Sequence, residues 1–303
     1  MNKTNPLVSV CIPTYNRAKT LEKTVNAVIN NGYENLEIVI SDNASTDETQ
    51  IVCGKFSAKD KRVIYFRHPE NQGPTKNFQF AREQANGKYF LWQGDDDFLG
   101  PDYIQTCVNE LEQDEALVAA AGLGAYFSID GVVSHYGNVI QCNSGSAWQR
   151  VIKYLFLVQD NSIFYGVYRS QNLATCWMPN ELAGDWAWVA QVLMKGKAKI
   201  IPSIFVYRAQ GDSTSASLDR IVAVLGAPKW NSRFPLVATS INISNHLILQ
   251  SQQSRLKKIP VQIIAHLAIY IVILTGRLVI FLRIHYKKIP FAGKIYAKFF
   301  KKE

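Results

Sequence analysis

The sequence is poor in cysteine, and its cysteines lack the spacing that would give them a common role. Five cysteines are scattered over 303 residues, with no CxxC pair and no Cys/His ligand set. An odd number without such spacing argues against a disulfide framework and against a structural zinc site. The N-terminus also lacks a long apolar run behind a basic start, so it gives no indication of export. We therefore expect reduced thiols in a cytosolic protein.

Acidic residues are nearly absent from the end of the chain. After residue 254 there are eleven Lys and Arg but one acidic residue, Glu303, so this tail carries +10 and accounts for the net charge of +9 of the whole chain. Residues 1–254 are close to neutral. Nucleic-acid binding would favour basic residues spread over a recognition face with aromatic residues among them. The charge pattern therefore argues against a nucleic-acid partner.

Internal repeats and low-complexity segments are also absent, and the first hundred residues instead alternate between two patterns. Runs typical of buried strands alternate with segments whose apolar residues have helical spacing. The order βαβαβαβ favours a mainly parallel sheet covered by helices. The expected strands are residues 7–13, 36–43, 62–68 and 88–97, and the expected helices are residues 17–32, 47–56 and 74–86.

Polar clusters follow three of these strands. They are PTYNR (13–17), SDNASTD (41–47) and GDDD (94–97). In parallel α/β sheets, ligands bind at the carboxyl ends of the strands. We therefore expect the three clusters to form one binding site.

The GDDD cluster places three carboxylates in a row, at Asp95, Asp96 and Asp97. A turn or a helix cap needs only one of them, and three repel one another. A hard divalent cation would remove the repulsion, because Mg²⁺ and Mn²⁺ take oxygen ligands and commonly bridge carboxylates to phosphates. The cluster therefore indicates a metal ion and a substrate that carries phosphate.

The pattern changes after residue 101. We expect a helix near 102–114, a strand at 163–170, a helix at 184–196 with Asp185 in its first turn, and a strand at 198–208. We divide the chain into a domain at 1–215, whose pattern changes at residue 101, a helical connector at 216–258 and a tail at 259–303.

The tail is apolar and basic at once. Residues 259–276 are apolar on nearly every face, and a second apolar stretch follows Arg277. This length is marginal for a spanning helix, which needs about 20 apolar residues. Lys257, Lys258 and the Lys, Tyr and Phe residues beyond the helix suit anionic lipid headgroups. We expect a helical, membrane-associated tail that lies in the bilayer plane rather than spanning it. The alternative is a buried helix pair that packs on the main domain or on a second subunit.

Four segments together resemble family 2 glycosyltransferases of the GT-A fold. They are residues 8–28, 37–49, 71–104 and 184–208, and the resemblance covers about residues 7–215 in the expected order. It implies a Rossmann-like α/β fold with a mainly parallel central sheet flanked by helices. It also implies a nucleotide-sugar donor and transfer of the sugar to a hydroxyl group. Residues 1–215 would then be the glycosyltransferase domain, with 1–101 as its nucleotide-binding half and 102–215 as its acceptor half.

The resemblance assigns several residues to the donor nucleotide. Thr14 and Tyr15 would line the pocket for the base and ribose, and Asp42 would accept a hydrogen bond from the base. Asp42 could instead cap the helix that follows. Lys76 and Asn77 match a basic and amide pair that faces the nucleotide, although a solvated helix face explains them equally well.

The same resemblance identifies a metal site in the acidic run. Pro101 aligns Asp96 with the family's metal-binding carboxylate and Asp95 with the position beside the sugar or ribose. Many relatives have an aspartate where this chain has Gly94. It stays open whether Asp95 or Asp97 completes the contacts of Mn²⁺ or Mg²⁺, and we take Asp96 and Asp97 as the expected metal ligands.

Two further residues of the second half complete the expected site. Asp185 matches the acid that takes the proton from the acceptor hydroxyl in inverting members, and Gly184 replaces a second acid common in relatives. A structural role of Asp185 at the helix N-terminus is the alternative. Arg208 would contact the pyrophosphate, unless it is a surface arginine.

The residues thus favour a metal-dependent glycosyltransferase. We expect it to use a glycan or a lipid-linked saccharide as acceptor, at the cytoplasmic face of the inner membrane, in bacterial surface-polysaccharide or O-antigen synthesis. A catalytically silent GT-A-like binding module is the leading alternative, but it would not need Asp42, Asp96 and Asp185 together. A nucleotidyltransferase would favour a Gly/Lys/Arg-rich phosphate loop after the first strand, and PTYNR is not one.

Overall fold

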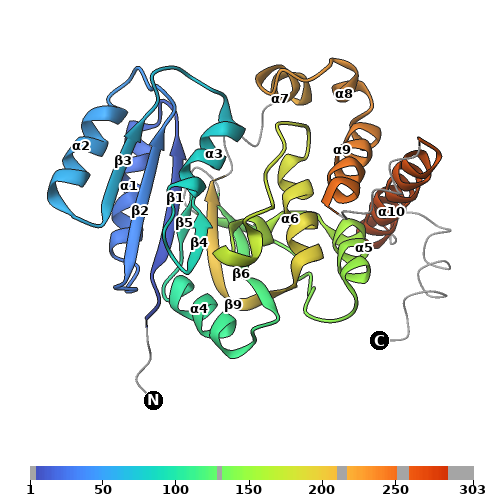
Figure 1. Ribbon diagram of the computed structural model, residues 1–303, viewed down its shortest axis with the longest axis horizontal. Coiled ribbons are helices and arrows are strands. Elements are labelled where there is room, and N and C mark those ends of the chain that lie inside the picture. Colours follow the sequence, from blue (N-terminus) through green and yellow to red (C-terminus); the bar gives the residue numbers. More distant parts are fainter. Residues whose placement is uncertain (1–4, 128–131, 210–216, 251–258, 286–303) are drawn as a thin grey trace.

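The first part of the chain forms the parallel half of a central sheet, as the alternating pattern predicts. The computed structural model describes residues 5–127, 132–209, 217–250 and 259–285 (Figure 1). All residues of β1 and β2 are buried, which is typical of a sheet covered on both faces. The elements in this part are β1 (Val8–Thr14), α1 (Ala18–Ile29), β2 (Leu36–Asp42), α2 (Thr49–Lys59), β3 (Val63–Arg67), α3 (Pro74–Glu83) and β4 (Tyr89–Trp92).

The remaining strands extend this sheet but change its direction. The strand order is β3-β2-β1-β4-β8-β6-β9-β5, with β7 paired to β6. The first four strands are parallel, as are β6 and β9, whereas β8, β5 and β7 join antiparallel. The α/β fold is thus confirmed, with a sheet that is parallel in its first half and mixed in its second. The added elements are β5 (Phe98–Leu99), α4 (Tyr103–Gln113), β6 (Leu117–Phe127), β7 (Val133–Tyr136), α5 (Ala147–Leu157), β8 (Val167–Arg169), α6 (Gly184–Lys195) and β9 (Lys197–Ala209).

Helices cover both faces of the sheet because successive strand residues point to opposite sides. Val10 and Ile12 of β1 pack in the cluster with α1, α2 and α4, whereas Cys11 between them packs in the cluster with α3, α5 and α6. In the second cluster the indole rings of Trp92 and Trp188 lie 4.8 Å apart, edge to face. All five cysteines are buried and free, which agrees with the expected reduced thiols.

The expected strand at 163–170 is mostly not a strand. Residues Ser162–Tyr165 form the 3₁₀ helix η1, and only Val167–Arg169 pair as β8. Gly166 separates the two, and a Cβ there would come 2.9 Å from the carbonyl oxygen of Ala120. The close approach of β6 therefore limits the strand, and the turn of η1 directs Tyr165 to the site described below. A second 3₁₀ helix, η2 (Ser170–Leu173), follows β8.

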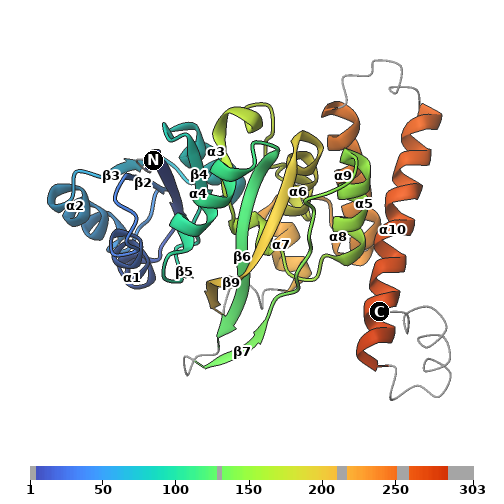
Figure 2. The same ribbon diagram turned by 90° about the horizontal axis from the view of Figure 1, so that it is seen from below.

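The last part of the chain is helical and packs on α5 and α6. It comprises α7 (Leu218–Val224), α8 (Trp230–Arg233), α9 (Pro235–Gln250) and α10 (Ile259–His285). Helix α10 passes through Gly276 without a break, and a Cβ at this glycine would collide with the backbone of Phe156 in α5. The guanidinium of Arg277 lies 4.9 Å from the ring of Trp186. Packing on the main domain, the alternative left open by the sequence, is thus the observed arrangement of α10 (Figure 2).

One face of α10 stays uncovered. Its exposed residues Leu267, Ile271, Leu274, Leu278 and Phe281 follow one another at alternating steps of four and three. This spacing places them on a single stripe of the helix. Among the helices that the structure describes, none is both long and apolar enough to cross a bilayer.

Candidate active site

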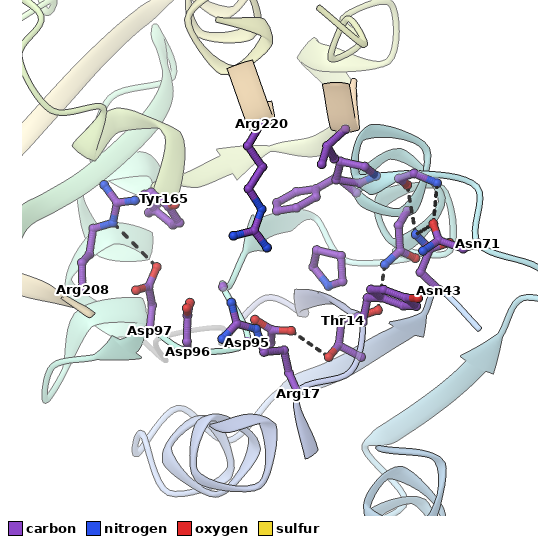
Figure 3. A pocket seen from close by; sticks show the side chains of 18 residues that line it. Thr14, Arg17, Asn43, Asn71, Asp95, Asp96, Asp97, Tyr165, Arg208 and Arg220 are labelled. Atoms are coloured by element: carbon purple, nitrogen blue, oxygen red, sulfur yellow. Dashed lines mark hydrogen bonds and ion pairs between the residues drawn. The ribbon is translucent and has the colours of Figure 1, made fainter. Parts of the chain in front are cut away.

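A pocket of about 590 Å³ opens where the carboxyl ends of β1 and β4 meet α3, η1, β9 and α7 (Figure 3). This is the edge of the sheet at which the three polar clusters were expected to meet. Two of the clusters contribute directly, and the third contributes one residue. The lining residues are Pro13, Thr14, Tyr15, Arg17, Asn43, Asn71, Gly73, Pro74, Asn77, Phe78, Gly94, Asp95, Asp96, Asp97, Tyr165, Arg208, Arg220 and Val224.

One end of the pocket is built from amides and an aromatic ring. Asn43 donates to the Asn71 side-chain oxygen at 2.9 Å and accepts from the Gln72 backbone N–H at 2.8 Å. Asn77 is buried and donates to the carbonyl oxygens of Thr14 and Ser41. Tyr15 is 43% exposed. This end therefore offers fixed polar groups and an accessible ring face, which suits a planar heterocycle.

Helix α3 is directed at this end by its first residues. Gly73 adopts a φ of 86°, which favours glycine, and Pro74 occupies the first helical turn, where its missing N–H has no helical acceptor. The helix then starts at the pocket wall with Asn77 on the inward side. Lys76, predicted beside Asn77 to face the nucleotide, is exposed and does not line the pocket.

Asp42 differs from the prediction in a similar way. It is fully buried, accepts from the Tyr65 hydroxyl at 2.9 Å and the Ser45 N–H at 2.8 Å, and lies 3.6 Å from the Arg67 guanidinium. These partners satisfy the carboxylate beneath the pocket, so Asp42 shapes the turn after β2. The next residue, Asn43, reaches the pocket instead. Asp42 does not cap α2, whose N-cap residue is Glu48; Asp47, just before it, accepts from the Thr49 N–H at 3.0 Å.

The other end of the pocket carries the acidic run. Asp95 accepts a hydrogen bond from the Thr14 hydroxyl at 2.7 Å, which joins the end of β1 to the turn after β4. Burial raises the pKa of Asp95 to about 6, and the charge of Asp96 adds to the rise, while Thr14 and Arg17 oppose it. A cation placed here would favour the ionised form of Asp95.

Asp97 points toward an arginine. Its carboxylate lies 3.7 Å from the Arg208 Nε, too far for a hydrogen bond but close for an ion pair between two largely buried groups. Arg208 also donates to the hydroxyls of Tyr126 at 3.0 Å and Tyr165 at 2.8 Å. Burial lowers the pKa of Arg208, but Tyr165, Asp97 and Tyr126 more than offset this and raise it above its ordinary value. Arg208 is therefore a fixed cation in the pocket wall, not a surface arginine.

Gly94 explains the inward position of Asp97. A Cβ at residue 94 would come 2.8 Å from the Asp97 Oδ2. The space that a side chain at residue 94 would take is thus filled by the carboxylate of Asp97. The glycine at residue 94 therefore leaves room for the ion pair between Asp97 and Arg208.

A divalent cation fits the acidic run through Asp96. Within the described part of the chain, no three His, Cys, Asp or Glu side chains are grouped to enclose an ion. Mg²⁺, however, is usually held by one or two carboxylates together with substrate phosphates and water. Asp96 lines the pocket between Asp95, which accepts from Thr14, and Asp97, which pairs with Arg208 (Figure 3). Asp96 is accordingly the carboxylate best suited to share an ion with a diphosphate.

Asp185 lies in the first turn of α6, near the acidic end of the pocket but not on its wall. It accepts from the Asn161 amide at 2.9 Å, and Asn161 accepts from the Tyr154 hydroxyl at 2.8 Å. Burial raises the pKa of Asp185, while Asn161 and Arg208 oppose the rise. A side chain at residue 184 would collide with the carbonyl oxygen of Pro179, so glycine is required there and Asp185 is the only acid of this pair.

Five lining residues with polar or charged side chains were not among the predicted site residues: Arg17, Asn43, Asn71, Tyr165 and Arg220. Arg17 and Asn43 lie inside the polar clusters that the sequence singled out, so their positions gave a signal. Asn71 precedes α3 in a segment of the resemblance. Tyr165 was not singled out because residues 163–170 were expected to form a regular strand. Arg220 was not singled out because its segment was predicted only to be a helical connector.

Fold and pocket together define an α/β protein with a polar pocket and an acidic run at the carboxyl edge of its parallel strands. The model of glycosyl transferase family 2 matches residues 9–169, more than half of the chain. The chain therefore belongs to this family and is a glycosyltransferase.

Two curated relatives extend beyond the matched family segment. An uncharacterized glycosyltransferase of Haemophilus influenzae is 30% identical over 200 residues, which cover 65% of this chain and 76% of the relative. The GalNAc(5)-diNAcBac-PP-undecaprenol beta-1,3-glucosyltransferase of Campylobacter jejuni is 29% identical over 209 residues, which cover 67% and 65%.

Among solved structures, the fold is similar to the mannosyltransferase PcManGT from Pyrobaculum calidifontis in complex with GDP-Man and Mn²⁺. The TM-score is 0.54 at 16% identity, and the match covers 98% of this chain and 80% of that chain. At this identity the likeness concerns the fold alone. The expected GT-A architecture is confirmed by it.

Proposed function

We propose that the protein transfers a sugar from a nucleotide-sugar to a hydroxyl of a glycan or lipid-linked saccharide, with inversion at the anomeric carbon. The observation that carries this is the two-ended pocket. An amide and aromatic end at Tyr15, Asn43 and Asn71 suits the base, and an acidic end at Asp96 suits the phosphates and the sugar. Thr14 and Asp95 connect the two ends through their hydrogen bond.

The leaving group needs help because a diphosphate accumulates charge as its bond to the sugar breaks. Asp96 would hold Mn²⁺ or Mg²⁺ against the diphosphate. When bound, the ion supplies positive charge that stabilises the departing diphosphate. Asp97 keeps Arg208 oriented at the same end of the pocket, and Arg208 adds a permanent cation there. One protein with a similar fold, the mannosyltransferase PcManGT, was solved in complex with GDP-Man and Mn²⁺, and this is consistent with a nucleotide-sugar donor and a divalent cation here.

Asp185 would act as the general base. Its carboxylate takes the proton from the acceptor hydroxyl while the hydroxyl oxygen forms a bond to the anomeric carbon. The bond from that carbon to the diphosphate oxygen breaks at the same time, and its electron pair leaves with the diphosphate. Asn161 donates to one carboxylate oxygen at 2.9 Å and so fixes the orientation of the Asp185 side chain. The burial that raises the pKa of Asp185 also makes it a better base.

The surface of α10 supports a lipid-linked acceptor at a membrane surface. The uncovered stripe of α10 presents five large apolar side chains, and the chain continues beyond it into a lysine-rich segment. Apolar side chains next to lysines suit the interface of an anionic bilayer. The Campylobacter relative bears the name of an enzyme for an undecaprenol-linked saccharide. These observations support work at the cytoplasmic face of the inner membrane in the synthesis of a bacterial surface polysaccharide.

The function is tested with purified full-length protein and a panel of UDP-, GDP-, CDP- and dTDP-sugars in the presence of Mn²⁺. Release of the free nucleotide is measured with and without EDTA. We expect release from one donor class, stimulated by an acceptor extract and lost with EDTA. No release from any donor would contradict the proposed reaction, and full activity in excess EDTA would contradict the metal ion.

A further inference from the structure

Two arginines of the pocket have no part in the roles described so far. Arg17 comes from the N-terminus of α1, and Arg220 comes from α7, on the opposite side of the pocket. Neither guanidinium forms a hydrogen bond or an ion pair with another residue in the described segments. Arg208, by contrast, is held by Tyr126, Tyr165 and Asp97. Among the described residues, the pocket therefore contains one arginine held by protein partners, Arg208, and two that have no such partner, Arg17 and Arg220.

The position of the pair is the middle of the pocket. Figure 3 shows Asn43 and Asn71 at one end, Asp97 and Arg208 at the other, and Arg17 and Arg220 reaching into the space between. In a nucleotide-sugar, the diphosphate is the part that joins the nucleoside to the sugar. A donor lying along the pocket would thus bring its diphosphate between the two arginines.

The charges that line the pocket also indicate that a bound diphosphate needs further cations. Three carboxylates line the pocket, and a diphosphate brought next to them meets repulsion. A divalent cation at Asp96 would offset part of this repulsion, and so would Arg208, which pairs with Asp97. Together they would not neutralise both the carboxylates and the diphosphate. The planar guanidinium fork offers paired N–H donors that match the non-bridging oxygens of a phosphate.

Helix α7 is anchored well enough to hold Arg220 in this position. The Asn180 side chain donates to the carbonyl oxygen of Leu225, just after α7, at 3.0 Å. The Ser217 hydroxyl accepts from the Arg220 backbone N–H and caps the helix at its start. The side chain of Arg220 is exposed and extends from this turn into the pocket.

We propose that Arg17 and Arg220 form a diphosphate clamp, in which α7 supplies the second half of the donor site from outside the family-matched segment. This inference rests on the proposed nucleotide-sugar donor. It adds residues that bind the leaving group directly from two sides. It also makes α7, in the segment that sequence patterns mark only as a connector, part of the donor site.

The test is a binding comparison. UDP, GDP, CDP and dTDP are titrated into the full-length protein with Mn²⁺, and their affinities are measured by calorimetry. The nucleoside diphosphate that binds most tightly is then compared with its parent nucleoside, whose binding is measured by ligand-observed NMR. The variants are Arg17→Ala, Arg220→Ala, Arg220→Lys and, as a control, Arg233→Ala, an exposed arginine of α8 outside the pocket. Melting temperatures verify that each variant is folded.

We expect Arg17→Ala and Arg220→Ala each to weaken nucleoside diphosphate binding about tenfold or more, because each removes charge-assisted hydrogen bonds. Nucleoside affinity stays at the wild-type value, Arg220→Lys recovers part of the loss, and Arg233→Ala changes neither. Wild-type diphosphate affinity in both alanine variants would overturn the clamp alone. An equal loss of nucleoside and diphosphate binding would also overturn it, because the arginines would then shape the pocket. Failure of the wild-type protein to bind any of the four diphosphates would overturn the proposed donor together with the clamp.

Discussion

The parallel half of the sheet and the segments after residue 101 contribute to the same pocket in different ways. β1 and β4 deliver Thr14, Asp95 and Asp96 directly from their carboxyl ends, within a few residues of a buried strand. Tyr165, Arg208 and Arg220 come from a 3₁₀ helix, the end of a long strand and a short helix. The first group follows from strand geometry, whereas the second is brought to the site only by packing.

The comparison also separates two kinds of carboxylate. Asp95 and Asp96 belong to the strand-end group, and Asp185 belongs to the packed group, behind the wall and held by Asn161. If this division is functional, changes in the first group should affect donor and metal binding, and changes in the second should affect turnover. The predictions below test that division, from the largest expected effect to the smallest.

Asp96→Ala is expected to have the largest effect. It removes the carboxylate best placed to share a cation with the diphosphate, so transfer should fall by about 10³ or more. Nucleotide-sugar affinity in the presence of Mn²⁺ should fall as well, as measured by calorimetry. Glu34→Ala, which removes an exposed carboxylate outside the pocket, is the control. Retained metal-dependent transfer in Asp96→Ala would show that the ion is held elsewhere.

Asp185→Asn should lower kcat by roughly 10² while donor affinity stays near the wild-type value, because the amide keeps the size but cannot accept the proton. The base works when ionised, and burial raises the pKa of Asp185. The acid limb of the kcat profile should therefore lie above the ordinary aspartate pKa of about 3.9 and disappear in the variant. Normal turnover in Asp185→Asn would leave this residue with a structural role only.

Asp97→Asn tests whether Asp97 binds the metal or the arginine. Loss of its charge leaves the largely buried Arg208 guanidinium without its ion-pair partner. The free energy of unfolding should fall by about 2 kcal/mol, somewhat less than the cost of removing one partner of a buried ion pair altogether, because the amide keeps the size and polarity of the side chain. The Mn²⁺ concentration for half-maximal activity should not change. A large increase in that concentration would instead identify Asp97 as a metal ligand, as the sequence suggested.

The smallest effect concerns the uncovered stripe of α10. Replacing Leu267 and Leu274 with serine should weaken binding to vesicles that contain anionic lipid by about tenfold, because two apolar side chains no longer enter the interface. Nucleotide release in detergent should be unchanged. Ile51→Ser, an exposed apolar residue of α2, is the control. If the double variant changes the oligomeric state while vesicle binding is normal, the stripe contacts a second copy of the chain.

Much of the first half could be predicted from local patterns. The expected strands and helices overlap those of the structure, because strand and helix periods are set by backbone geometry. The largest difference is in β4, which ends at Trp92 instead of residue 97, so the GDDD cluster lies in the turn after the strand. The polar clusters after the strands met at one edge for the same reason. The second half was harder to predict. Residues 163–165 were expected to belong to a strand, but they form part of a 3₁₀ helix that ends where β6 lies close to Gly166.

The sequence by itself determined the family, the α/β fold, the binding edge of the sheet and the residue types gathered there. Only the tertiary structure decided which neighbour of each pair faces the pocket: Asn43 rather than Asp42, and Asn77 rather than Lys76. The same holds for Asp97, which turns to Arg208 because residue 94 has no side chain. Period and composition are properties of a local segment, but the direction of a side chain at the end of a strand depends on partners that are distant in the chain. Tyr65 and Arg67 hold Asp42 below the pocket, and no local pattern around residue 42 contains them.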